Sequence, residues 1–191
     1  MARITKPVEE RRQEIINTAR KLFTENGFDK TTAAEISKAM NVADGLIFHY
    51  FKSKTDILYA VIDELAAEQT EKVKRILDDY SGSAFEGLKL VFNSQKDYET
   101  HSKLIASLKS DQAIIEYCIK KMTSSAMPLL FSLIERGNAD NSWNCKYPKE
   151  TVAFILQGFS GLIEFHESST DEEHKILAFT DILFRILGVG Y

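Results

Sequence analysis

Residues 32–54, TAAEISKAMNVADGLIFHYFKSK, constrain the fold of this chain more than any other stretch. Thr32 is placed to cap a short helix, and Glu35, three residues later, completes a capping box. Asn41 stands where this helix must turn, in a left-handed conformation that asparagine tolerates. A second short helix follows the turn. Two short helices joined by a tight turn predict a helix-turn-helix motif.

The second helix of this motif starts at Ala43 or Asp44, runs for about two turns, and places Ile47 and Phe51 in the core. A helix of this length after a tight turn is sized for the DNA major groove. Residues 1–54 hold ten Lys and Arg against seven Asp and Glu, a balance of +3, whereas the rest of the chain has a balance of −7. A basic head on an acidic body suits a protein that sets one end against phosphates. The sequence therefore predicts DNA binding.

Apolar periodicity predicts helices along the whole chain and no strand, an all-α fold of about nine helices. The first helix should run from about Val8 to Asn26, where Gly27 ends it. The fourth should run from about 54 to 79 and connect the head to the body. Further helices are expected at about 84–96, 100–109, 112–136, 148–166 and 171–187, with residues 137–147 as the one long loop.

The composition is that of a globular protein, with 191 residues, 44% hydrophobic and 27% charged. No apolar run approaches the roughly 18 residues of a membrane span, and the start MARITKPVEERR lacks an apolar signal region. We therefore expect a cytoplasmic protein that does not enter a membrane. Cys118 and Cys145 are too few for a disulfide framework and are expected to be reduced.

Two stretches in register over about fifty residues carry a resemblance to a known family. They read RRQEIINTARKLFTENGFDKTTAAEISKAM and NVADGLIFHYFKSKTDIL. Together they resemble the TetR family of bacterial transcriptional regulators, closely over residues 9 to about 60 and only in architecture beyond. The resemblance implies a three-helix helix-turn-helix DNA-binding domain in residues 1–54. It also implies a helical effector-binding and dimerisation domain in residues 55–191.

The same resemblance implies which residues face double-stranded DNA. Thr32, Tyr50 and Lys54 are expected at phosphates, where contacts fix the register of the protein on the duplex. The start of the recognition helix is expected near base edges, because small side chains let a helix sit deep in the groove. The residues expected at DNA are Thr32, Ala33, Ala43, Asp44, Gly45, Leu46, Phe48, His49, Tyr50 and Lys54.

Three positions depart from the usual pattern of that family. Asp44 stands where lysine or glutamine is common, Leu46 where threonine or serine is common, and Phe48 where tyrosine is common. Asp44 can accept a hydrogen bond from cytosine N4, and Leu46 can touch a thymine methyl. Phe48 is equally compatible with the core and with DNA. Compensating phosphate contacts are expected from the basic residues Lys6, Arg11 and Arg12.

The last two expected helices carry long apolar stripes. The resemblance implies that they pair with their mates in a homodimer, and a palindromic operator needs such a dimer because its half-sites lie about 34–36 Å, or a multiple of this, apart. The alternative is that both helices are buried within a monomer. The residues expected at the dimer interface are Leu156, Phe159, Ile163, Leu183 and Ile186.

A small-molecule effector site inside the body is also implied by the resemblance. Aromatic and Met side chains with a few polar atoms suit an apolar or amphipathic ligand. Bound effector would shift the body to a conformation with lower DNA affinity, which makes the protein a ligand-released repressor. The residues expected to line this site are Phe92, Tyr98, His101, Tyr117, Met122, Met127, Phe131, Phe154, Gln157 and Phe165.

The sequence leaves two alternatives to this interpretation. An enzyme is disfavoured because the four histidines lack metal-ligand spacing and no phosphate-binding or nucleophile motif occurs. No catalytic residue, metal or cofactor is therefore expected. The second alternative is a DNA-binding protein whose helical body recruits a protein partner instead of sensing a small molecule.

Overall fold

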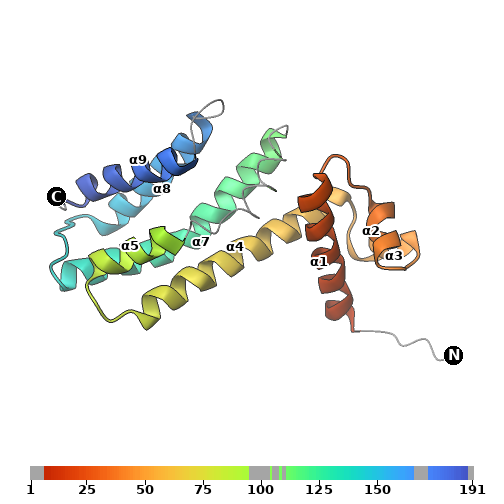
Figure 1. The fold of residues 1–191 in the computed structure, drawn as a ribbon, viewed down its shortest axis with the longest axis horizontal. Coiled ribbons are helices and arrows are strands. Elements are labelled where there is room, and N and C mark those ends of the chain that lie inside the picture. The colour runs from red at the N-terminus through yellow and green to blue at the C-terminus, as the bar shows by residue number, and fades with distance from the viewer. Residues whose placement is uncertain (1–6, 95–103, 105–107, 109–110, 166–171, 189–191) are drawn as a thin grey trace. The chain divides into compact units, whose positions relative to one another are not determined.

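The computed structural model describes residues 7–94, 104, 108, 111–165 and 172–188, which form eight α-helices and no strand. Helices α1 (Val8–Asn26), α2 (Ala33–Ala39), α3 (Asp44–Tyr50) and α4 (Lys54–Asp79) come first. They are followed by α5 (Ala84–Ser94), α7 (Gln112–Ala139), α8 (Pro148–Phe165) and α9 (Glu172–Ile186) (Figure 1). The predicted all-α fold is confirmed, and the predicted helix at 100–109 falls mostly outside the described residues. None of the described helices is both long and apolar enough to cross a membrane.

The described residues pack into two compact units, and α4 and α7 each contribute to both. The first unit takes residues up to Leu65 together with those of 98–118, and the second takes residues of 66–97 and 119–191. The predicted functional division at residue 54 stays a prediction. Packing divides the chain elsewhere, because the first half of α4 belongs to the first unit.

In the first unit, α1 lies against α2, and α2 against α3 (Figure 1). Helix α1 buries Ile15, Ile16 and Phe23 completely. Gly27 ends α1 with φ +85°, a conformation that glycine adopts without strain, and its N–H donates to the carbonyl oxygen of Phe23. Phe28 then turns back, with its ring 5.3 Å from that of Phe23, and the corner between α1 and α2 is closed.

Residues from a distant part of the sequence complete this core. Their side chains are as deeply buried as those of α1, and they belong to the same apolar cluster; they are Leu104, Leu108, Ile114 and Cys118. Beside them the rings of Tyr59 and Tyr117 lie 4.2 Å apart, and the Tyr117 hydroxyl donates to Asp63 at 2.8 Å. The start of α7 is therefore part of the first unit, which is called the head from here on, and a specific hydrogen bond joins it to α4.

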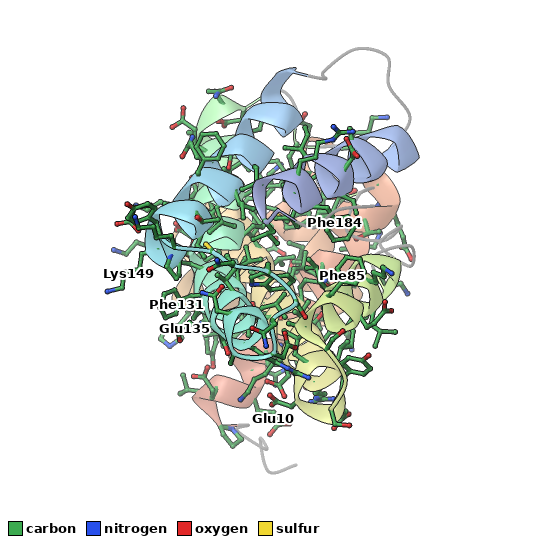
Figure 2. The ribbon with its side chains drawn as sticks, turned by 90° about the vertical axis from the view of Figure 1, so that its left-hand side faces the viewer. Glu10, Phe85, Phe131, Glu135, Lys149 and Phe184 are labelled. Carbon is green, nitrogen blue, oxygen red and sulfur yellow. The ribbon has the colours of Figure 1, made fainter. Side chains whose placement is uncertain are left out.

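The second unit has its own core, in which α8 and α9 lie side by side (Figure 1). Phe85 of α5 and Phe184 of α9 pack with ring centroids 5.1 Å apart (Figure 2). The end of α4 is held by Arg136 of α7, whose guanidinium donates to the carbonyl oxygens of Leu77 and Tyr80 at 3.2 and 2.7 Å. These two carbonyl oxygens lie at the C-terminal end of α4, where backbone acceptors have no intrahelical donor, and Arg136 supplies the missing donors.

One boundary differs from the prediction. Helix α7 continues through Gly137 to Ala139, although Gly137 was expected to open the loop. Gly137 is buried against the indole of Trp143, and a Cβ at this position would overlap that ring. The Trp143 Nε1–H donates to the carbonyl oxygen of Ile134 at 2.9 Å and fixes the ring there. The glycine therefore serves close packing and does not end the helix.

Candidate nucleic-acid interface

Helix α2 begins with the predicted capping box. The Glu35 backbone N–H donates to the Thr32 hydroxyl oxygen at 3.2 Å, and the Thr32 backbone N–H donates to the Glu35 carboxylate at 2.7 Å. The backbone and hydroxyl hydrogen bonds from Thr32 lower the pKa of Glu35. The Thr32 hydroxyl is therefore already engaged in capping, although it was expected at a phosphate.

The turn between α2 and α3 has the predicted left-handed residue, since Asn41 has φ +54°. The N–H of Val42 donates to the carbonyl oxygen of Ser37 at 3.0 Å and holds the turn closed. Helix α3 then starts at Asp44 with Ala43 as its N-cap, and no side chain caps it. The helix-turn-helix geometry predicted from the sequence is thus present.

Asp44 is tied to α2 by a contact that the sequence did not predict. The hydroxyl of Ser37, which is fully buried, donates to the Asp44 carboxylate. The same hydroxyl lies 2.9 Å from the carbonyl oxygen of Ala34, and its single proton serves one acceptor at a time. One signal for this contact lies in the sequence, because Ser37 is a polar residue within a short helix on the side that faces the core. The contact holds the start of α3 against α2.

The two faces of α3 differ sharply. Ile47 and the following Phe51 are buried in the core of the first unit, as predicted. On the other side, the Phe48 side chain is 56% exposed, which resolves the open question in favour of the surface. Ala43, Asp44, Gly45 and His49 are also exposed, and Leu46 and Tyr50 are half-buried. Helix α3 therefore exposes a short and mostly uncharged surface, while its opposite face is packed in the core.

Lys54 lies at the first turn of α4 and closes the corner between α1 and α2. Its ammonium donates to the carbonyl oxygens of Phe28 at 2.8 Å and of Asp29 at 3.4 Å, and lies 4.2 Å from the centroid of the Phe28 ring. An ammonium has three N–H donors, so a third donor remains for a phosphate oxygen. Lys54 thus has a structural role, and its expected phosphate contact stays a prediction.

Two of the arginines expected to add phosphate contacts are held on α1. The Arg11 guanidinium pairs with the Glu14 carboxylate at 2.7 Å, and the Arg12 guanidinium lies 5.1 Å from the centroid of the Phe51 ring. Lys6 lies outside the described residues. Both arginines belong to the same unit as α3, but the charge of Arg11 is balanced by Glu14, and Arg12 alone lies against the apolar core.

The residues expected at an effector site are spread over both units. Tyr117 lies in the first unit, half-buried, and Met122 and Phe131 are half-buried on α7 in the second unit. Met127, Phe154 and Gln157 are exposed. The remaining expected residues, Phe92, Tyr98, His101 and Phe165, have side chains outside the described part of the structure. Their assembly into one site stays a prediction.

The residues expected at a dimer interface lie on α8 and α9. Leu156 and Leu183 are buried in the core of the second unit, and Ile186 is exposed. The side chains of Phe159 and Ile163 fall outside the described set. Among the residues whose placement is described, no group of three His, Cys, Asp or Glu side chains is placed to hold a metal ion.

Comparisons with known proteins agree with this geometry. The family model described as bacterial regulatory proteins, tetR family, matches residues 15–61. The HTH-type transcriptional regulator HbdR of Aromatoleum sp. (strain CIB) is 38% identical over 73 residues, 38% of this chain and 32% of that protein. The HTH-type transcriptional repressor Rv1474c of Mycobacterium tuberculosis is 36% identical over 66 residues, 35% of this chain and 33% of that protein. The matched part thus spans about a third of each relative.

Similarity of fold extends over nearly the whole chain. The crystal structure of a transcriptional regulator from Cytophaga hutchinsonii ATCC 33406 superimposes with a TM-score of 0.72. It covers 92% of this chain and 94% of that one, at 17% sequence identity. At this identity the likeness shows the fold alone. The relatives and the fold neighbour are transcriptional regulators and not enzymes.

Proposed function

Because the chain belongs to the TetR family of bacterial transcriptional regulators, we propose that it is a homodimeric repressor of a palindromic operator. In this proposal a small apolar or amphipathic effector binds the helical body and releases the DNA. The observation that carries the DNA-binding step is the arrangement of α3. Ile47 and Phe51 anchor the helix in the core, and Phe48 stands out from it.

Contacts to DNA divide into two classes in this proposal. Tyr50 and Lys54, with Thr32 and Ala33 at the start of α2, position the head on the phosphates. The exposed face of α3, from Ala43 to His49, lies against base edges in the major groove. The Ser37–Asp44 hydrogen bond supports this division, because it sets the orientation of α3 against α2 before DNA is met.

Exposed apolar side chains on α9 support the proposed dimer. Ile182 and Ile186 are both exposed although they are large and apolar. Residues four apart lie on one face of a helix, so these two form a stripe that a second copy can cover. A two-fold dimer also supplies the two recognition helices that a palindrome requires.

The effector step is supported by the surface of α7. Met127 is exposed, and Met122 and Phe131 are half-buried on the same helix. Methionine and aromatic side chains adapt to apolar ligands of varied shape. A ligand that binds one body conformation better than the other shifts the population of DNA-competent protein by its difference in affinity.

Operator binding is tested by fluorescence anisotropy of the full chain with the promoter DNA upstream of its own gene. The titration is run at two salt concentrations, with a scrambled duplex of the same composition as the control. Saturable binding that far exceeds the control is the expected result. Equal, salt-sensitive binding to both duplexes at every concentration would contradict a sequence-specific regulator.

The dimer is tested by sedimentation of wild type, Ile186→Glu and Lys149→Glu. Both variants place a carboxylate on the second unit. Lys149→Glu is the control, because Lys149 is an exposed polar residue at the start of α8. We expect Ile186→Glu alone to shift the protein towards monomer and to weaken operator binding. A monomeric wild-type protein at micromolar concentration would rule the dimer out.

The effector step is tested by screening apolar and amphipathic compounds for release of the labelled operator. A true effector should also raise the Tm of the free protein, because it binds the native state. Compounds that release DNA without raising Tm act elsewhere. If a protein partner, and no small molecule, released the operator, the partner-recruiting alternative would replace this step.

A further inference from the structure

The recognition surface of α3 lacks the side chains that read guanine and adenine by hydrogen bonds. Those bases are recognised in the major groove mainly by Arg or Lys and by Asn or Gln. None of these four residue types occurs in Asp44–Tyr50, whose sequence is DGLIFHY. The bidentate hydrogen bonds that most often identify a purine are therefore not available to this helix.

The acidic residue of the helix is already committed to a contact within the protein. The Asp44 carboxylate accepts the hydroxyl proton of Ser37 and is drawn towards α2. A carboxylate has no proton to offer to the N7 and O6 acceptors of purines. Asp44 thus serves to orient α3 and adds no attraction for a guanine edge, whose major-groove groups are both acceptors.

Phe48 is the one large apolar side chain that α3 exposes. Its neighbours one turn earlier on the helix surface are Asp44 and Gly45. A Cβ built on Gly45 would meet no atom within 4 Å, so packing inside the protein does not require glycine there. Because Gly45 has no side chain, nothing projects from the helix beside the Phe48 ring, and the ring can approach a base pair closely.

We propose that Phe48 reads thymine, by packing its ring against the C5-methyl group in the major groove. Thymine is the only base that presents a methyl group there, so an exposed phenyl ring distinguishes A·T from T·A and from both G·C orientations. This inference rests on the proposed function and names the base chemistry that its operator must contain. Each half-site holds a thymine opposite Phe48.

The probe is a duplex obtained by selection from a random pool with the full-length wild-type protein. Each thymine of the selected half-site is replaced in turn by deoxyuridine, which removes the C5-methyl and keeps every hydrogen-bonding group. We expect one position at which the wild type loses affinity by about fourfold for each methyl removed, the factor expected for burying one carbon of apolar surface. At that position Phe48→Ala should bind the thymine and deoxyuridine duplexes equally.

Two further variants complete the test. Phe48→Tyr keeps the ring and should keep the preference for thymine. Tyr147→Ala removes an aromatic side chain that is 58% exposed and lies outside the head, and it should also keep the preference. Because Phe48 is exposed, Phe48→Ala should unfold at nearly the wild-type temperature, so its loss of discrimination is not a loss of folding.

The outcomes separate this inference from the function on which it rests. If the selected duplex binds specifically and no deoxyuridine substitution weakens the wild type, the reading of thymine by Phe48 is overturned and the regulator stands. A selected half-site without thymine has the same meaning. If selection yields no preferred sequence, both the specific regulator and this inference fail.

Discussion

The ammonium of Lys54 lies 2.8 Å from the carbonyl oxygen of Phe28, and this hydrogen bond ties the start of α4 to the corner after α1. Twenty-six positions of sequence separate the two residues. Helices α2 and α3 lie between them in the chain, so the bond closes the head around the helix-turn-helix. The ammonium that the sequence predicts at DNA thus also holds the helix-turn-helix in place.

Replacing Lys54 should therefore affect both stability and DNA binding. We expect Lys54→Met, which keeps the aliphatic stem, to lower the Tm of the free protein and to weaken binding to all duplexes alike. Loss of one phosphate contact should flatten the dependence of log affinity on log salt by about one unit. The exposed neighbour change Lys52→Met provides the comparison. A lower Tm with an unchanged salt slope would leave Lys54 a structural role only.

The Ser37–Asp44 hydrogen bond predicts a second effect. Ser37→Ala should lower the free energy of unfolding by about 1 kcal/mol, because one intramolecular hydrogen bond is lost. Operator affinity should fall further than this loss of stability explains, since α3 loses the contact that orients it. Urea unfolding and anisotropy measure the two quantities. Ser132→Ala, at an exposed site on α7, should change neither.

The environment of Tyr117 predicts that the stability of the folded protein falls at alkaline pH. Burial, and then the hydrogen bond to Asp63, raise the pKa of Tyr117 from 10.0 to about 12 in the folded protein. The folded pKa lies above the unfolded value, so this contribution to stability is fully present below pH 10 and is lost as the pH rises towards 12. Ultraviolet titration of tyrosinate should show one late-titrating group that Tyr117→Phe removes. If the late group persists in Tyr117→Phe, it belongs to another tyrosine.

The buried glycine of α7 gives a steric prediction. Gly137→Ala places a methyl group on the Trp143 ring and should cost about 1–3 kcal/mol of stability, as overpacking of a core does. Tryptophan fluorescence should report the displaced ring, because Trp143 is the single tryptophan of the chain. Gly45→Ala is the matched change, since its methyl meets no atom within 4 Å. It should be neutral or slightly stabilising, and equal losses in both variants would contradict the steric account.

Local features of this structure follow from the sequence. The Thr32–Glu35 capping box, the left-handed Asn41 and the end of α1 at Gly27 each depend on a few neighbouring residues. Their physical causes act within one or two turns of the chain, so a single sequence contains them. For the same reason the helix-turn-helix and its anchoring residues Ile47 and Phe51 were predicted correctly.

Contacts between separate elements of the fold did not follow in this way. Lys54 was predicted at a phosphate and Gly137 at the start of a loop, but their partners, Phe28 and Trp143, are set by how the elements pack. The same holds for Ser37, whose hydroxyl finds Asp44 only after the turn has closed. Whether a polar group faces DNA or a neighbouring helix is a tertiary property, and composition alone does not decide it.

The head core has a practical consequence for building hybrid regulators. Leu104, Leu108 and Ile114 are buried in the same cluster as the side chains of α1 and α4. A chimera joined at residue 65 would transplant the residues proposed to read DNA but leave these three behind, so the transplanted segment would meet an unmatched apolar surface. Exchange of operator preference between relatives therefore calls for three crossover points, with residues 104–118 transferred together with the N-terminal segment.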